Sequence, residues 1–238
     1  MTPSDPANGP VPLDLDAARR IQREYGAWAP VYDWFARATA SIGGVREGCA
    51  AALDLEPGDT VVDFGCGPGI NFPALREAVG PDGHVVGVDV THPMLERARG
   101  LVERRGWENV SVMQGDATRP PIESADGVLS TFVTSLFADP YAVVCEWCDL
   151  ADHVVVTNFA PYGGRAANAA LRAFAQLNAR LFDVDAGDPL RQLEARTEKS
   201  RRALADCLDS VVYRDYVFGT IRLHAGYRDP TDEIDDST

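Results

Sequence analysis

A predicted buried strand that runs directly into a glycine-rich turn constrains this chain most. Residues 61–69 read Val-Val-Asp-Phe-Gly-Cys-Gly-Pro-Gly, so an apolar run with one acid precedes three glycines at alternating positions. Glycine tolerates positive φ and lets backbone approach a ligand closely, because it has no Cβ. The segment therefore predicts a loop that wraps around a small ligand.

The spacing of the glycines and the acid indicate which ligand the loop binds. A dinucleotide fingerprint places its third glycine where this chain has Ile70, and it holds a pyrophosphate at the following helix N-terminus. Asp63 instead puts a negative charge beside the loop, which repels a pyrophosphate and attracts an ammonium or sulfonium group. The ligand is therefore expected to be positively charged, and a nicotinamide oxidoreductase is disfavoured.

This loop resembles the first motif, D-x-G-x-G-x-G, of the class I S-adenosylmethionine-dependent methyltransferases, through Asp63, Gly65, Gly67 and Gly69. The resemblance implies S-adenosylmethionine as the cofactor. It also implies that Asp63 holds the methionine ammonium and that Gly65, Cys66 and Gly67 form the loop around the ligand.

Two later strand ends follow in the order that this family requires. Residues 84–89 form an apolar run that ends in Asp89, whose carboxylate can accept hydrogen bonds from both ribose hydroxyls. The resemblance implies that the next residue, Val90, packs on the adenine. After a third run, residues 110–114, it implies that Asp116 accepts from the adenine amino group and that the Ala117 amide meets the ring.

The methionine end of the cofactor is expected to meet Thr131 and Phe132, at the end of a fourth strand. Residues 25–33 resemble the Y-x-x-x-A-x-x-Y-D element of a subgroup that includes quinone-ring C-methyltransferases and bacterial phosphatidylethanolamine N-methyltransferases. That resemblance implies a lid in which Tyr25 or Tyr32 faces the sulfonium or the nucleophile. Packing of both tyrosines against the sheet is the alternative that the sequence leaves open.

Strand and helix patterns alternate along the chain, which predicts an α/β fold with a doubly wound, mostly parallel sheet. The resemblance adds the Rossmann-like methyltransferase form of this fold, with N-terminal lid helices and an antiparallel last strand. Seven strands are expected, at residues 61–64, 84–89, 110–114, 128–132, 154–158, 211–217 and 220–227.

The 238 residues fit one domain with a sizeable core. We expect a disordered N-terminus at 1–13 and a disordered acidic tail at 229–238, because both are polar and rich in helix-breaking or acidic residues. The single methyltransferase domain then covers 14–228, with lid helices at 14–45 and a helical insert or cap at 160–208. The two helices of that insert either wall an acceptor pocket or pack on the sheet.

Composition bears on the environment of the protein. The formal charge is −14, and Lys199 is the only lysine. Such an acidic surface is typical of halophilic proteins, in which salt screens the self-repulsion. The five cysteines are odd in number and scattered, which fits reduced thiols in a cytoplasm. The first residues do not resemble a signal peptide, and no apolar run approaches membrane-spanning length, so stable membrane insertion is not expected.

Cys145 and Cys148 form a C-x-x-C pair, but no second pair of ligands accompanies it, so no metal site is predicted. They are interpreted as helix cysteines rather than as metal or redox groups. His92, His153 and His224 are interpreted as structural, and no catalytic residue is assigned.

The acceptor is expected to be a small molecule or a lipid-like compound. The fourth strand lacks the Asn/Asp-Pro-Pro-aromatic element that holds a flipped base, and no basic stripe with aromatics is present, so a nucleic-acid partner is not expected. An RNA or protein methyltransferase and a non-catalytic S-adenosylmethionine-binding protein stay open as alternatives.

Overall fold

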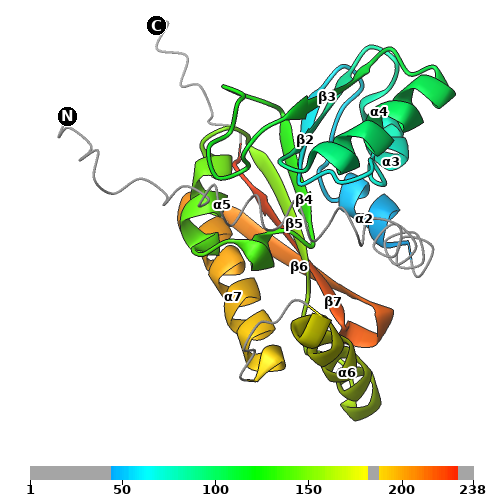
Figure 1. The fold of residues 1–238 in the computed structure, drawn as a ribbon. Coiled ribbons are helices and arrows are strands. Elements are labelled where there is room, and N and C mark those ends of the chain that lie inside the picture. The colour runs from blue at the N-terminus through cyan, green and yellow to red at the C-terminus, as the bar shows by residue number, and fades with distance from the viewer. Residues whose placement is uncertain (1–43, 182–187, 230–238) are drawn as a thin grey trace, which may run out of the picture.

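The computed structural model describes residues 44–181 and 188–229 (Figure 1). The predicted N-terminus at 1–13 lies outside the described residues, as do the predicted lid at 14–45 up to residue 43, including Tyr25 and Tyr32, and the predicted tail at 229–238 apart from Asp229. In the described part the chain forms a seven-stranded sheet in the order β3-β2-β1-β4-β5-β7-β6. Its strands are β1 Thr60–Phe64, β2 His84–Asp89, β3 Val110–Gln114, β4 Gly127–Thr131, β5 His153–Phe159, β6 Ser210–Tyr216 and β7 Ile221–Tyr227.

Strands β1 to β5 pair in parallel, whereas β7 runs antiparallel to both of its neighbours, β5 and β6. The predicted mostly parallel sheet with an antiparallel last strand is therefore confirmed. The predicted strands agree with the observed ones to within a residue at each end. The 3₁₀ turn η2, Val217–Gly219, joins β6 to β7.

Helices cover both faces of the sheet, as expected for a doubly wound fold (Figure 1). Helices α2 Val45–Ala51, α3 Phe72–Val79 and α4 His92–Arg105 pack on one face, and α5 Pro140–Cys148 and α7 Pro189–Cys207 pack on the other. Alternate residues of β1 serve the two cores, since Val61 belongs to the first and Val62 to the second. Asp63 therefore faces the α2 and α3 side.

The region predicted as a helical insert contains α6, Arg165–Leu181, and α7. Helix α7 packs on α5 and on the sheet, with Ala203 and Leu204 buried against the strands. Helix α7 therefore covers this part of the sheet. Helix α6 contacts α7 beyond the strands (Figure 1). No helix among the described residues is long and apolar enough to cross a membrane.

The chain reverses direction across the sheet between β1 and β4. It moves from β1 outward through β2 to β3, and then returns to β4 on the other side of β1. In open α/β sheets, this reversal leaves a crevice at the carboxyl ends of the two central strands, and ligands bind there. The predicted cofactor loop, residues 65–69, follows β1 at this crevice.

Candidate functional site

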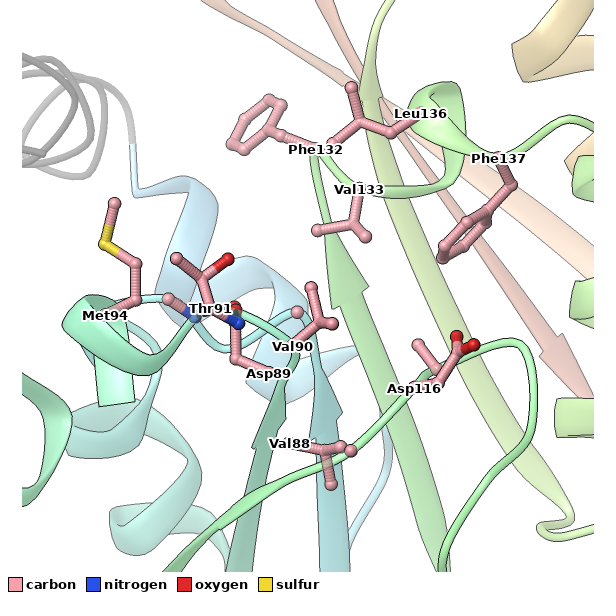
Figure 2. A pocket seen from close by; sticks show the side chains of 14 residues that line it. Val88, Asp89, Val90, Thr91, Met94, Asp116, Phe132, Val133, Leu136 and Phe137 are labelled. Atoms are coloured by element: carbon pink, nitrogen blue, oxygen red, sulfur yellow. Dashed lines mark hydrogen bonds between the residues drawn. The ribbon is translucent and has the colours of Figure 1, made fainter. Parts of the chain in front are cut away.

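A pocket lies at the carboxyl ends of β1, β2, β3 and β4 (Figure 2). Among the described residues, its lining holds two carboxylates and no arginine or lysine. The lining residues are Gly65, Gly67, Val88, Asp89, Val90, Thr91, Met94, Gly115, Asp116, Ala117, Phe132, Val133, Leu136 and Phe137. A pocket with this charge attracts a cationic ligand and repels a phosphate.

The first two glycines of the loop, Gly65 and Gly67, are needed for different physical reasons. Both have positive φ, 72° at Gly65 and 54° at Gly67. A Cβ at Gly65 would overlap the Val133 side chain, so this glycine allows β4 and the loop to pack together. A Cβ at Gly67 would meet no protein atom within 4 Å, so the space in front of this residue is open. Gly67 is therefore the place where a ligand can approach the backbone.

Asp89 connects the glycine loop to the start of α4. Its Oδ2 accepts a hydrogen bond from the Gly67 amide at 2.9 Å, and its Oδ1 accepts one from the Thr91 amide at 2.7 Å. Burial raises the pKa of Asp89, and the two amides oppose that shift. The carboxylate is thus fixed in the pocket wall by two backbone amides.

The loop after β3 is held from two sides. Asp116 Oδ1 accepts from the Thr118 amide at 2.9 Å and from the Thr118 hydroxyl at 2.8 Å. The Ala117 carbonyl accepts from Trp147 Nε1 at 2.8 Å, which ties the loop to α5. Both residues line the pocket.

Asp63 lies behind the pocket wall, in a buried polar network on the α2 and α3 side. Its side chain is fully buried, and Asn71 Nδ2 donates to both of its oxygens at 3.0 Å. Arg46 Nη1 donates to Asn71 Oδ1 and to Thr131 Oγ1, each at 2.7 Å. The structure thus joins Asp63 and Thr131 in one buried hydrogen-bond network. Cys66 is also buried behind the pocket.

Burial sets the direction in which the pKa of Asp63 is shifted, and its polar neighbours reduce that shift. Burial raises its pKa to about 7, while the hydrogen bonds from Asn71 and the positive charge of Arg46 oppose the rise. The guanidinium of Arg46 lies 5.3 Å from the centroid of the Phe132 ring, which lines the pocket. Its Nε is buried and has no hydrogen-bond partner among the described residues. This hydrogen-bond donor, Arg46 Nε, and the Asp63 carboxyl, with a pKa of about 7, therefore belong to the same network at this end of the crevice.

The wall of the pocket that follows β4 is apolar. Phe132, directly after β4, has a φ of 63°, and its ring packs on Phe159 with centroids 4.6 Å apart. Positive φ is uncommon for a residue with a bulky side chain. Val133 and Phe137 continue this wall, and Leu136 in the 3₁₀ turn η1, Thr134–Leu136, is 55% exposed. Phe132, Val133, Leu136 and Phe137 therefore lie together on one side of the pocket (Figure 2), and Leu136 is exposed to solvent.

Six of the ten predicted cofactor residues line the pocket: Gly65, Gly67, Asp89, Val90, Asp116 and Ala117. Asp63, Cys66 and Thr131 lie behind it, and Tyr25 is outside the described residues. The three histidines interpreted above as structural do not line it: His92 pairs with Glu96, His153 bonds the Leu53 carbonyl, and His224 is buried.

Sequence reasoning missed Arg46 and Asn71. Arg46 had a signal, because it stands at helical spacing with Cys49, Ala50 and Leu53, all of them buried. An arginine on the apolar face of a predicted helix needs a buried partner. Asn71, at the start of α3, carried no such signal. No group of three or more His, Cys, Asp or Glu that could hold a metal occurs within residues 44–181 and 188–229.

Comparison with known proteins agrees with this geometry. Residues 61–151 match a family model described as a methyltransferase domain. The phosphatidylethanolamine N-methyltransferase of Cereibacter sphaeroides is 33% identical over 153 residues, which cover 61% of this chain and 70% of that protein. This chain belongs to the class I S-adenosylmethionine-dependent methyltransferases.

Other relatives share a shorter segment. The arsenite methyltransferase of Halobacterium salinarum is 38% identical over 99 residues, which cover 38% of this methyltransferase and 25% of the relative. The chain spans less than half of the length of several further curated relatives. A crystal structure of an S-adenosylmethionine-dependent methyltransferase from Aquifex aeolicus has a TM-score of 0.56 at 21% identity, covering 76% of this chain and 87% of that one. This structural likeness shows the fold.

The cofactor of the family, S-adenosylmethionine, is compatible with the groups present. It is a cation, and the pocket carries two carboxylates with no basic side chain among its described lining. The open space at Gly67 admits a ligand against the backbone. The unpartnered Arg46 Nε lies in the network around Asp63, where an amino-acid end would bring a carboxylate and an ammonium.

Proposed function

We propose that this methyltransferase transfers the methyl group of S-adenosylmethionine to a small-molecule or lipid-like acceptor. The observation that carries the proposal is the division of the pocket: fixed carboxylates stand on one side, and Phe132, Val133, Leu136 and Phe137 form an apolar wall on the other. The first side suits a cationic donor, and the second suits an apolar acceptor. The similarity to a phosphatidylethanolamine N-methyltransferase supports the lipid-like class.

The residues would hold the donor in three places. Asp89 would accept from the ribose hydroxyls, and Asp116 with the Ala117 amide would meet the adenine, with Val90 packed on the ring. The Asp63 network would face the methionine end, where Asp63 attracts the ammonium and Arg46 the carboxylate. Gly65, Cys66 and Gly67 would supply the loop, and Thr131 would position Arg46 through their hydrogen bond. Tyr25 is proposed to belong to a lid over this site.

The sulfonium supplies an activated methyl group, so the reaction is an in-line displacement that needs little acid–base chemistry. The protein's work is then alignment and exclusion of water. Phe132 is placed for both tasks, because its strained backbone and its contact with Phe159 fix the ring at the pocket. No general base is required by this scheme, and none of the pocket-lining residues among those described is a histidine.

The test is methyl transfer from labelled S-adenosylmethionine to separate pools of apolar small molecules, phospholipids, RNA and protein. We expect label in one of the first two pools. Asp89→Ala should lower the transfer when S-adenosylmethionine is below saturation, and the exposed, remote Asp82→Ala should keep it. Label in RNA or protein alone would overturn the acceptor class. Binding of S-adenosylhomocysteine without transfer to any pool would indicate a non-catalytic binding protein.

We also propose that the protein works in a salt-rich cytoplasm. The charge of −14 supports salt adaptation, and the five free cysteines support a reducing compartment. The response of stability to KCl, described below, tests the first part.

A further inference from the structure

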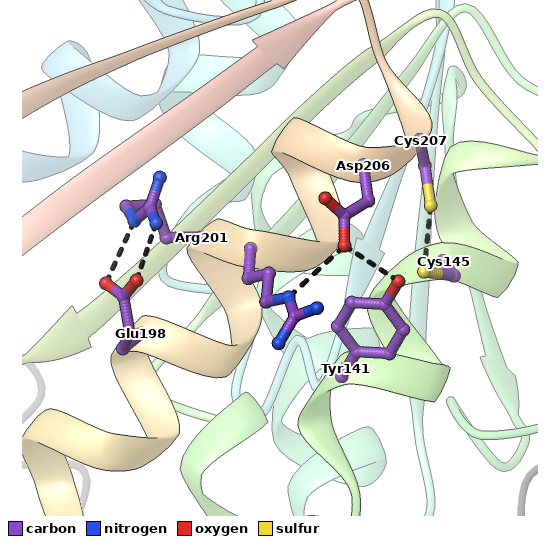
Figure 3. Close-up of polar contacts among 7 residues, drawn as sticks. Tyr141, Cys145, Glu198, Arg201, Asp206 and Cys207 are labelled. Carbon is purple, nitrogen blue, oxygen red and sulfur yellow. Dashed lines mark hydrogen bonds and ion pairs between the residues drawn. The ribbon is translucent and has the colours of Figure 1, made fainter.

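Two cysteines that are far apart in the sequence meet between α5 and α7. Cys207, the last residue of α7, donates a hydrogen bond through its thiol to Cys145 Sγ, and the sulfur atoms are 2.8 Å apart across a separation of 62 residues (Figure 3). The C-x-x-C spacing directs attention to Cys148, but Cys148 is buried in the core on this face of the sheet. The contact between helices therefore joins Cys145 to a partner that the spacing does not reveal.

Neighbouring polar contacts hold the two helices in register at the thiols. The Tyr141 hydroxyl on α5 donates to Asp206 Oδ2 on α7 at 3.0 Å, and Arg202 Nε donates to the same oxygen at 3.3 Å (Figure 3). Asp206 is the residue before Cys207, and Tyr141 lies one helical turn before Cys145. Sliding of α7 along α5 would break the hydrogen bond between Tyr141 and Asp206, so this contact keeps the sulfur atoms near each other.

Access and geometry both allow a reaction at this pair. Cys145 and Cys207 are partly exposed, whereas Cys148 is almost completely buried. A disulfide has an S–S length of about 2.0 Å, so a closer approach of less than about 1 Å is needed from the observed contact. Burial raises the pKa of Cys145 to about 12, which makes its thiolate scarce and its oxidation slow at neutral pH.

We propose that Cys145 and Cys207 are an oxidation site at which a hydroperoxide converts the thiol pair into a disulfide between α5 and α7. One sulfur attacks the peroxide, the O–O bond breaks, and a sulfenic acid forms with release of an alcohol or water. The second sulfur then attacks the sulfenic sulfur, the S–S bond forms, and water leaves. Two thiols lose two electrons and two protons in total, and the hydroperoxide is reduced.

The crosslink would stabilise the part of the domain that follows β4 in the chain. It would close a loop that contains β5, α6 and α7, and so it would restrict the unfolded chain. Helix α7 also braces the pocket wall, because Arg196 Nη1 donates to the Phe137 carbonyl at 2.5 Å. Oxidation is therefore expected to stabilise α7 against α5 and, through it, the apolar side of the pocket.

The first experiment maps the crosslink in the full wild-type chain. Folded protein is treated with hydrogen peroxide, remaining thiols are alkylated, and the denatured protein is cut by a protease that cleaves after glutamate. Cleavage after Glu146 separates Cys145 from Cys148. We expect the Cys207 fragment to be linked to the Cys145 fragment, with loss of two hydrogen atoms. A Cys145–Cys148 link, intermolecular dimers or only sulfinic acids would overturn the proposal.

The second experiment follows stability, with variants that separate the three cysteines. Peroxide should raise the Tm of the wild type and of the control Cys148→Ala by about 5 to 10 °C, and dithiothreitol should reverse the rise. Cys145→Ser and Cys207→Ser should each show no rise. An equal rise in Cys207→Ser, or no rise in the wild type, would contradict the assignment. The fragment map of the wild type decides the matter if a variant does not fold.

Discussion

The two sides of the pocket are built by different forces. On the side formed by β1, β2 and β3, which we call the donor side, backbone amides fix the carboxylates: Gly67 and Thr91 hold Asp89, and Thr118 holds Asp116. On the acceptor side, after β4, the wall is apolar, and its Leu136 is half exposed. Hydrogen bonds are directional and specify one ligand, whereas apolar contact is not directional and admits a range of ligands.

This difference predicts which property each substitution changes. Changes on the donor side should weaken binding of the cofactor whatever the acceptor, because every turnover uses the same donor. Changes on the acceptor side should alter which acceptors are used and leave cofactor affinity unchanged. The predictions below test this division from the largest expected effect to the smallest.

Gly67→Val should have the largest effect, a loss of S-adenosylhomocysteine binding of at least about 100-fold with the fold retained. The valine side chain would fill the open space in front of the loop, and the backbone of the valine would have to keep an unfavourable positive φ. Calorimetry measures binding, and circular dichroism checks the fold. Gly106→Val is the matched control, because Gly106 also has positive φ and open space but lies at the end of α4. Equal binding in both variants would refute the close approach at Gly67.

Asp89→Ala should weaken cofactor binding by about 1 to 3 kcal/mol, or roughly 5- to 150-fold, the range for hydrogen bonds to a charged group. The variant also removes the acceptor for the Gly67 and Thr91 amides, so the loop loses its tie to α4. The measurement is a calorimetric Kd, with the exposed Asp82→Ala as the control. An unchanged Kd in Asp89→Ala would argue against its role toward the ribose.

Asp63 should make cofactor affinity depend on pH. Its folded pKa is raised to about 7, so the carboxylate that attracts a cation forms only as the pH rises through that value. Affinity for S-adenosylmethionine should therefore increase by up to about tenfold per pH unit below pH 7 and level off above it. Asp89, whose pKa is also raised, would add a change of the same sign. Asp63→Asn should flatten most of the profile, and an unaltered profile in that variant would exclude Asp63 as the source.

The same shift has a consequence for stability. The ordinary pKa of the carboxyl is 3.8 and its folded value is about 7, so the folded protein binds more protons than the unfolded chain between these values. The stabilisation from the protonated group is complete below the unfolded pKa and is lost as the pH rises through the folded one. Asp63→Asn should remove this loss, which urea unfolding across that range would measure.

Leu136→Ala should raise the KM for the acceptor by about 3- to 10-fold, since part of a leucine's apolar area would be lost from the contact. The Kd for S-adenosylhomocysteine should stay the same. Val212→Ala on β6 is a matched control, because Val212 is a similarly exposed aliphatic residue away from the pocket. A change in cofactor Kd with no change in acceptor KM would reverse the assignment of the two sides.

Salt should have the smallest effect of these changes on ligand binding at the site, and a modest effect on the thermal stability of the whole protein. If the charge of −14 reflects salt adaptation, the Tm should rise by roughly 5 °C or more as KCl increases from about 0.1 to 2 M. Differential scanning fluorimetry measures this rise. A Tm that does not change with KCl would argue against salt adaptation as the reason for the acidic surface.

The donor side could be predicted from the sequence because its signals are local. Asp89 follows its own strand, and the glycines follow theirs, so order and spacing along the chain were enough. The network behind the pocket was not predictable in the same way: Arg46 and Thr131 are 85 residues apart, and only the fold brings them together. The role of Asp63 toward the methionine ammonium stays a prediction, and the structure adds that Asn71 donates to its buried carboxylate.

The region after β5 shows the same limit. The patterns predicted two helices at 160–208, and both exist. Whether they pack on the sheet depends on which neighbours the chain meets, and this cannot be read from an amphipathic stripe. Helix α7 covers the sheet against α5, and its Cys207 meets Cys145 there, a pairing that the C-x-x-C spacing did not indicate.

The central claim is that the crevice between β1 and β4 binds a cationic adenosyl sulfonium through carboxylates on separate strand ends. Calorimetric titration with S-adenosylmethionine, S-adenosylhomocysteine and NADH, each against the wild type and Asp89→Ala, tests it most directly. We predict micromolar binding of the first two ligands, a preference for the cationic one that grows as the pH rises through 7, and no binding of NADH. Binding of NADH alone, or equal heats for wild type and Asp89→Ala, would contradict the account.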